Sequence, residues 1–403
     1  MMDTGRKPQT IKRMNKALIL RTINKEGAIS RAELSRKTSL SMPTIMKIVD
    51  ELKEEGLIIE AGVAPSIGGR PPKVIKLNPK GAYAIGVKIL PNELRVVVAN
   101  LRNNFVARRV ETISPFSGYR KILAQLKDAI REVTYRSRVN FRQILGIGIG
   151  VPGIVNSSSN GKVIFAPNLR GWENVSLASD IEKEFDVPVF IENEARVSAL
   201  AEKWYGIARG VENFVCIDVA VGIGAGIVID GELYRGHGNL AGEIGHLVVV
   251  KNGPVCNCGK RGCLETVASN TAIINMVRNN PTSTIMRLCK ESENSITMKE
   301  IIKAVKVGDK ECEKYIKRAA VYLGRAIGYL INIIDPEMII INGEITLAGD
   351  VFFDPLKREI DKSAFRAGKI LPKIVTSGLG EDVGLIGASS LVIRNIFKGP
   401  RKV

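Results

Sequence analysis

The sequence has few histidines, few aromatic residues and no long apolar run. Only two of its 403 residues are histidine, and aromatic residues make up 5%. No stretch approaches the roughly 20 apolar residues that a membrane-spanning helix needs, and the N-terminus lacks the apolar segment of a signal peptide. The lack of long apolar segments argues against a membrane protein, and we expect a soluble, cytoplasmic one.

Acidic residues are too few to balance the basic ones. The formal net charge is +18, and residues 1–40 alone hold ten Lys or Arg against three acids. A basic segment of this kind attracts polyanions such as nucleic acid. The length and the 45% apolar content together predict two or three compact domains.

The first eighty residues have the pattern of a helix-turn-helix. A helix is expected over residues 9–25, and Ser30 and Glu33 have the spacing of a capping box that starts a second, short helix. A third helix is expected to begin with Ser41 as its cap. Its apolar residues recur at helical spacing on one face, namely Ile45, Ile48, Val49 and Leu52.

The opposite face of this third helix suits a DNA major groove. Ser41, Thr44 and Lys47 lie there, near the helix N-terminus, which is where a recognition helix needs short polar and cationic side chains. Two strands are expected to follow as a wing, and the loop between them places Arg70 to enter a minor groove. The alternative is a three-helix domain for protein contacts, followed by a linker that happens to contain an arginine.

The rest of the chain alternates between strands and helices in two successive blocks. Strand patterns occur around residues 84–99 and 144–151, and a second series begins at residue 214. Two α/β blocks in series predict two lobes with a ligand cleft between them.

Five segments carry a resemblance to the ROK family of repressors, open reading frames and sugar kinases. They are residues 148–153 (GIGVPG), 167–172 (PNLRGW), 188–195 (PVFIENEA), 242–246 (GEIGH) and 256–265 (CNCGKRGCLE). The resemblance implies an α/β protein with an N-terminal winged helix-turn-helix and a two-lobed actin-like/ribonuclease H-like ATPase-type (sugar kinase) fold.

This resemblance also divides the chain into three units. The expected boundaries are a DNA-binding domain at 1–80, a first lobe at 81–200 that is completed by 384–403, and a second lobe at 201–383. The second lobe is expected to carry a zinc site and an oligomerisation surface.

A metal site is expected in the second lobe. Cys256, Cys258 and Cys263 offer three thiolates at short spacing, and His246 stands where the family has its metal-binding histidine. Three Cys and one His make a closed tetrahedral shell that suits a structural Zn²⁺. The alternative is a group of buried or redox-active cysteines.

The resemblance also implies a sugar site. The residues that map onto sugar-contacting positions are Asn193, Glu194, Glu243, His246 and Glu265. Carboxylates and amides suit this role because they bridge adjacent hydroxyl groups. The alternative for Glu243 and Glu265 is a solvated surface.

Three departures separate the chain from the kinases of the family. Residues 88–92 (KILPN) replace a phosphate-binding Asp-x-Gly-Gly-Thr turn, and residues 220–222 (AVG) replace Gly-Thr-Gly. Glu194 stands at the position of the catalytic aspartate. Together these changes predict a sugar pocket without ATP chemistry.

The expected function is a sugar-responsive DNA-binding regulator, most simply a repressor, with no enzymatic activity. Its expected partners are double-stranded operator DNA, a small sugar such as glucose or xylose, and further copies of itself in a homodimer or tetramer. The main alternative is an active, glucokinase-like sugar kinase with an added DNA-binding domain. A repressor controlled by another protein and a zinc sensor are further alternatives.

Overall fold

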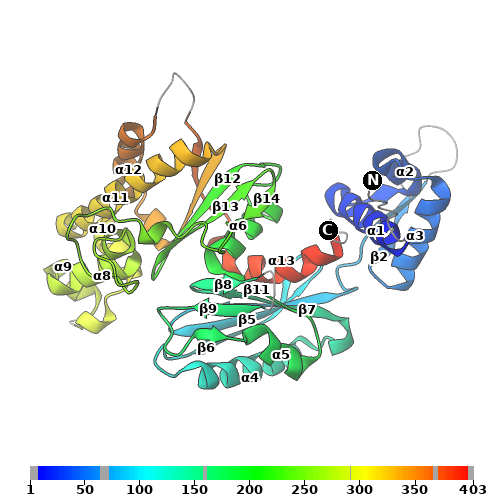
Figure 1. The fold of residues 1–403 in the computed structure, drawn as a ribbon, viewed down its shortest axis with the longest axis horizontal. Helices are drawn as coiled ribbons and strands as arrows, with labels where there is room; N and C mark the ends of the chain where they lie inside the picture. The colour runs from blue at the N-terminus through cyan, green and yellow to red at the C-terminus, as the bar shows by residue number, and fades with distance from the viewer. Residues whose placement is uncertain (1–7, 64–71, 158–160, 291, 366–370, 398–403) are drawn as a thin grey trace.

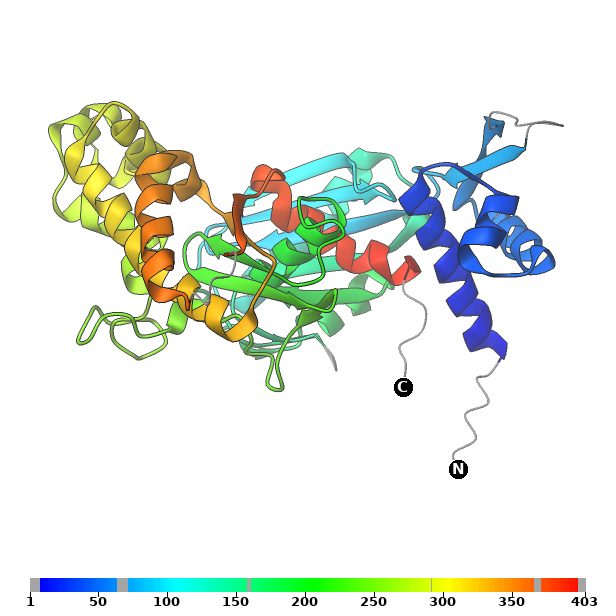
Figure 2. The same ribbon diagram turned by 90° about the horizontal axis from the view of Figure 1, so that it is seen from above.

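The computed structural model describes residues 8–63, 72–157, 161–290, 292–365 and 371–397. The N-terminal unit lies at one end of an elongated molecule, and the helices of the second α/β block lie at the other (Figures 1 and 2). None of the described helices combines the length and the hydropathy that crossing a membrane requires.

The N-terminal unit is a winged helix. Its elements are α1 (Pro8–Glu26), β1 (Ile29–Ser30), α2 (Arg31–Thr38), α3 (Met42–Glu54), β2 (Ile58–Val63) and β3 (Lys73–Leu77), and the strands form a sheet in the order β1-β3-β2. The expected capping box is present, because Glu33 donates its backbone N–H to the Ser30 hydroxyl and accepts the backbone N–H of Ser30.

The start of α3 differs from the sequence expectation in one respect. Ser41 stands at the N-cap position, but its side chain makes no capping hydrogen bond. Its hydroxyl instead pairs with that of Thr44 at 2.9 Å. Pro43, inside the first turn, has no N–H to offer, which leaves the serine oxygen free for this local contact.

The first lobe is built on a five-stranded sheet in the order β11-β7-β4-β5-β6. Its elements are β4 (Tyr83–Ile89), β5 (Glu93–Asn100), β6 (Phe105–Thr112), α4 (Tyr119–Ser137), β7 (Ile144–Val151), α5 (Leu177–Phe185) and β11 (Val189–Asn193). A small sheet of β8 (Ile154–Asn156), β9 (Lys162–Phe165) and β10 (Glu173–Val175) adjoins it.

The second lobe has a five-stranded sheet in the order β14-β13-β12-β15-β16. Its strands are β12 (Phe214–Val219), β13 (Ile223–Ile229), β14 (Glu232–Tyr234), β15 (Met338–Asn342) and β16 (Lys373–Thr376). Its helices are α7 (Glu265–Ala268), α8 (Asn270–Asn279), α9 (Ser283–Leu288), α10 (Met298–Lys306), α11 (Lys310–Ile334) and α12 (Asp350–Ser363). Short 3₁₀ turns include η2 (Ile244–His246) and η4 (Glu344–Ala348).

The two large sheets repeat one plan. In each, three strands consecutive in sequence pair antiparallel. A later strand pairs parallel to the first of them, and a further strand pairs parallel to that one. Such a duplicated sheet is what a two-lobed actin-like/ribonuclease H-like fold requires, so the expected fold class is confirmed.

Helices α6 (Glu194–Trp204) and α13 (Val383–Phe397) lie against each other between the two sheets (Figure 1). Glycines permit this close approach, since a Cβ at Gly226 would lie 2.5 Å from that of Ala199, and one at Gly387 would lie 1.8 Å from the Val197 carbonyl oxygen. The lobes therefore meet through a tightly packed pair of helices.

Helix α13 also joins the winged helix to the rest of the chain. Its residues Ile393 and Phe397 belong to one buried apolar cluster with Ile19, Leu20 and Ile23 of α1. The C-terminal end of α13 and α1 lie side by side in both views (Figures 1 and 2). The winged helix thus shares a core with α13.

Candidate ligand cleft, metal centre and DNA interface

A cavity of about 860 Å³ lies between the lobes. This volume is in the upper part of the range of small-molecule sites, which is roughly 300–1,000 Å³. All five residues expected to contact sugar line it: Asn193, Glu194, Glu243, His246 and Glu265. The structure therefore brings together residues that are far apart in the sequence.

The loop that carries Glu243 and His246 is held in place by close backbone contacts. Gly242 has a φ of +91°, and a Cβ there would lie 1.9 Å from the carbonyl oxygen of Ala225. Only glycine fits this position. The turn η2 that follows is a 3₁₀ turn, in which side chains three residues apart lie on the same side, as Glu243 and His246 do at its two ends.

A buried arginine supports the same loop. The Arg196 guanidinium donates to the carbonyl oxygens of Asn239 at 2.7 Å and Ala241 at 3.0 Å. Glu192, which is fully buried in the first lobe, pairs with Arg196 at 3.3 Å and with Arg235 of the second lobe at 2.7 Å. Sequence reasoning missed this network, although arginine and glutamate four residues apart on a buried segment were a visible signal.

Asn193 makes hydrogen bonds within the protein that the sequence did not predict. It caps α6, because its Oδ1 accepts the backbone N–H groups of Ala195 and Arg196. Its Nδ2 also donates to the carbonyl oxygen of Gly153 at 2.9 Å. One N–H is left, so the side chain can offer a ligand fewer hydrogen bonds than a free amide.

Two residues that the sequence did not single out for the cleft contribute polar groups to it. Asp218, near the end of β12, accepts hydrogen bonds from Ser198 at 2.6 Å and from Asn342 at 2.8 Å, and both Asp218 and Asn342 line the cavity. Lys88 lines it too and opposes the burial-driven rise of the Asp218 pKa. The lysine thus occupies the cleft where the kinases of the family have an acid.

The Glu194 carboxyl is a weaker acid than an ordinary glutamate. Burial raises its pKa from 4.5 to about 7, Lys88 opposes the rise, and the nearby carboxylates of Asp218 and Glu243 reinforce it. Because the folded-state pKa lies above the unfolded one, the folded protein takes up a proton between these two values. Stability therefore falls as the pH rises from about 4.5 to about 7.

We expect a Glu194→Gln variant to unfold at a higher temperature than the parent at pH 8 and at nearly the same temperature at pH 5. The gain at pH 8 has an upper limit of about 3 kcal/mol, set by the size of the pKa shift. Thermal unfolding at both pH values measures it, with Glu173→Gln on the exposed strand β10 as the control. An equal gain at both pH values would contradict the explanation.

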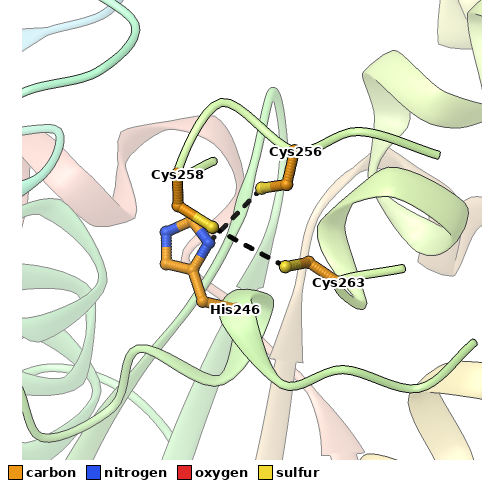
Figure 3. Close-up of side chains that lie close together, drawn as sticks. All are labelled: His246, Cys256, Cys258 and Cys263. Atoms are coloured by element: carbon orange, nitrogen blue, oxygen red, sulfur yellow. Dashed lines mark hydrogen bonds between the residues drawn. The ribbon is translucent and has the colours of Figure 1, made fainter. Parts of the chain in front are cut away.

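The four expected metal ligands converge (Figure 3). Their donor atoms all lie within 4.8 Å of one another, with 3.6 Å between His246 Nδ1 and Cys256 Sγ and 3.7 Å between the Sγ atoms of Cys258 and Cys263. A tetrahedron with metal–sulfur bonds of about 2.3 Å has edges of about 3.8 Å, so the spacing fits zinc.

Metal binding at this cluster would release protons. Burial raises the pKa of the Cys256 thiol to about 12, so this thiol would give up its proton to a metal rather than carry a charge without one at neutral pH. The second ring nitrogen of His246 points away from the thiols, and the ring lines the cleft (Figure 3). A bound ion would thereby orient a ring that faces the ligand.

The recognition helix presents the expected face. Ser41 and Lys47 are exposed and Thr44 is half-buried, while the four apolar residues of the opposite stripe are buried. The structure adds two residues of α3, because Met42 and Met46 are 41% and 45% exposed and suit contacts with thymine methyl groups. Arg70, expected to enter the minor groove, lies outside the described residues.

Comparisons with known proteins agree with this arrangement. The ROK family model matches residues 85–395, and a winged helix-turn-helix DNA-binding model matches residues 16–59. The chain is 34% identical to the xylose repressor of Caldicellulosiruptor bescii, over 97% of this chain and 98% of that protein. It is 31% identical to the N-acetylglucosamine repressor of Escherichia coli O157:H7, over 96% and 94%.

Solved structures show the same relationship. A ROK family transcriptional regulator, described as a homologue of the Escherichia coli MLC protein, superimposes with a TM-score of 0.83 at 30% identity, over 97% of this chain and 98% of that one. A ROK family glucokinase from Streptomyces griseus, in complex with glucose and AMPPNP, matches 77% of this chain and 99% of its own with a TM-score of 0.70 at 26% identity. The chain belongs to the ROK family and carries a winged helix-turn-helix domain ahead of the family's two-lobed fold.

Proposed function

We propose that this protein is a sugar-responsive transcriptional repressor of carbohydrate-utilisation genes. The observation that carries the proposal is the presence, in one chain, of a winged helix and a carboxylate-lined cleft that are joined by α13. The relatives named xylose repressor and N-acetylglucosamine repressor support a sugar as the effector.

The proposed roles of the three units follow the domain boundaries expected from the sequence. Residues 1–80 bind operator DNA through Ser41, Thr44, Lys47 and Arg70. The lobes at 81–200 with 384–403 and at 201–383 hold the sugar between them. Two copies in a homodimer, alone or within a tetramer, would place two recognition helices on a pseudo-palindromic operator.

The proposed sugar ligands are Asn193, Glu194, Glu243, His246 and Glu265, and the proposed metal is a structural Zn²⁺ held by His246, Cys256, Cys258 and Cys263. Sugar would favour one arrangement of the lobes and move the winged helices through α13. This requires the sugar to bind one arrangement better than the other, and a coupling free energy of about 1–3 kcal/mol is typical of such switches.

A DNA-binding titration tests the proposal. The full chain is bound to its own upstream DNA at fixed salt and titrated with a panel of sugars, because phosphate contacts make the affinity salt-dependent. Release of the DNA by one sugar at micromolar to millimolar concentration is the expected result. DNA binding that no sugar changes would favour control by another protein or by metal.

The Glu243→Gln variant is expected to need about tenfold more sugar to release the DNA. A neutral amide accepts hydrogen bonds from ligand hydroxyls less strongly than a carboxylate does. Its DNA affinity without sugar is expected to be unchanged. Glu173→Gln on β10 is the matched control. A normal release curve for Glu243→Gln would argue against this carboxylate as a sugar ligand.

An active sugar kinase is the second candidate, because Glu194 places a carboxylate with a pKa near 7 in the cleft. Three features of the cleft make it the weaker one. Pro91 offers no N–H to a phosphate, Val221 offers no hydroxyl, and Lys88 replaces an acid. Consumption of ATP in the presence of a sugar would favour the kinase.

A further inference from the structure

The cleft continues well beyond the proposed sugar ligands. Parallel strands β12, β15 and β16 are neighbours in the second sheet, and their carboxyl ends meet at its cleft edge. Asp218, Asn342 and Ser377 lie at or just after these ends, and all three line the cavity. These three residues form a row along the sheet edge. With neighbouring strands about 4.8 Å apart, this row extends roughly 10 Å from β12 to β16. It leads away from β13, the strand that contacts η2 with its residue His246.

The side-chain oxygen of one residue in this row, Asn342, lacks a hydrogen-bond donor among the described residues. Asn342 is only 7% exposed, and its Nδ2 donates to Asp218 at 2.8 Å. Its Oδ1 is buried and finds no hydrogen-bond donor among the residues that the structure describes. Asn342 lines the cavity, so a ligand that brings an O–H or N–H group to this wall would supply the missing donor.

The chemistry at this end of the cavity is unsuited to phosphate. Glu344 and Glu381 contribute carboxylates there, with Lys299 and Arg95 as neighbouring cations, of which Arg95 already pairs with Glu381 at 3.5 Å. On the facing lobe, Leu90 and Pro91 replace the flexible turn that would cradle a phosphate. A negatively charged nucleotide would meet acids and a missing N–H, whereas a neutral polyhydroxylated ligand would meet hydrogen-bond acceptors.

Apolar side chains complete the same region. Leu347, on the turn η4, is 61% exposed at the cavity wall, and Leu90 and Pro91 line the wall from the other lobe. Sugar rings have apolar C–H faces and polar edges, so they suit a site that combines apolar walls with a few polar groups.

We propose that the cleft contains a second subsite, formed around Asn342, Glu344, Leu347 and Ser377, which binds a further neutral sugar unit. The effector is then a disaccharide or a longer oligosaccharide rather than a single sugar. The inference rests on the proposed function, because it assumes that the first unit occupies the site at Glu243 and His246.

Calorimetric titration of the full-length protein tests this inference. The probes are xylose with xylobiose, glucose with cellobiose and maltose, and N-acetylglucosamine with chitobiose, together with AMPPNP. For one of these series the disaccharide is expected to bind about tenfold more tightly than its monosaccharide. A Leu347→Trp variant, which fills the second subsite from an exposed position, is expected to remove this advantage and to leave the monosaccharide Kd within about twofold.

Leu288→Trp, at an exposed site outside the cleft on α9, is the matched control and is expected to leave both affinities unchanged. Equal affinity for mono- and disaccharide, with no effect of Leu347→Trp on either, would overturn the second subsite while DNA release by a monosaccharide still upheld the proposed function. AMPPNP binding that Leu347→Trp abolishes would also overturn it, in favour of a nucleotide. No binding of any sugar would remove both proposals.

Discussion

Replacing Cys263 with serine is expected to release the metal and to weaken sugar binding by about tenfold or more. Cys263 is fully buried, and its Sγ lies 3.7 Å from that of Cys258, so serine cannot complete the set of thiolates. Structural zinc contributes roughly 10–16 kcal/mol to folding in small zinc peptides, which makes the loss of one ligand severe. Without the ion, the His246 ring at the cleft wall loses the metal bond that would fix its orientation.

Elemental analysis of the purified variant measures the metal, and calorimetry measures the sugar affinity. Cys289→Ser is the matched control, since Cys289 is also a buried cysteine of the second lobe but lies outside the cluster. It is expected to keep both zinc and sugar affinity. A Cys263→Ser protein that loses zinc but binds sugar normally would separate the metal from the pocket and contradict the proposed role of the ion.

Replacing Lys47 with glutamate is expected to weaken operator binding by about 100-fold. Lys47 is exposed on the front of α3, and reversal of its charge turns an attraction to DNA into a repulsion. The side chain does not belong to the buried stripe of the helix, so the winged helix should remain folded. Electrophoretic mobility shift or fluorescence anisotropy at fixed salt measures the change.

Lys306→Glu is the control for charge, because Lys306 is an exposed residue of α10 at the end of the molecule opposite the winged helix (Figure 1). It is expected to bind operator like the parent. Sugar affinity is expected to be normal in both variants. If the two reversals weakened DNA binding equally, the effect would reflect net charge alone, and the assignment of α3 as the recognition helix would be wrong.

Sequence reasoning succeeded where the relevant residues are close along the chain. The capping box of Ser30 and Glu33 depends on residues three apart, and the three cysteines of the candidate metal site fall within eight residues. Resemblance supplied His246 and the carboxylates of the cleft. For such local or inherited features, spacing and residue type carry nearly all of the physical information.

Features that depend on packing between distant segments could not be predicted from spacing and residue type. Asp218 and Asn342 meet only because β12 and β15 pair in parallel, across more than a hundred intervening residues. The cap formed by Asn193 and the carbonyl contacts of Arg196 likewise depend on how α6 enters the space between the lobes. The unmet acceptor of Asn342 becomes visible only when its surroundings are known.

The shared core of α1 and α13 has a consequence for how the protein is made. The winged helix leaves the ribosome well before α13, although Ile393 and Phe397 pack against Ile19 and Ile23. During synthesis, the DNA-binding unit is therefore free of the helix that later fixes its position. A chain that stops before α13 would lack this contact between the winged helix and the lobes, so we expect regulated DNA binding to need α13.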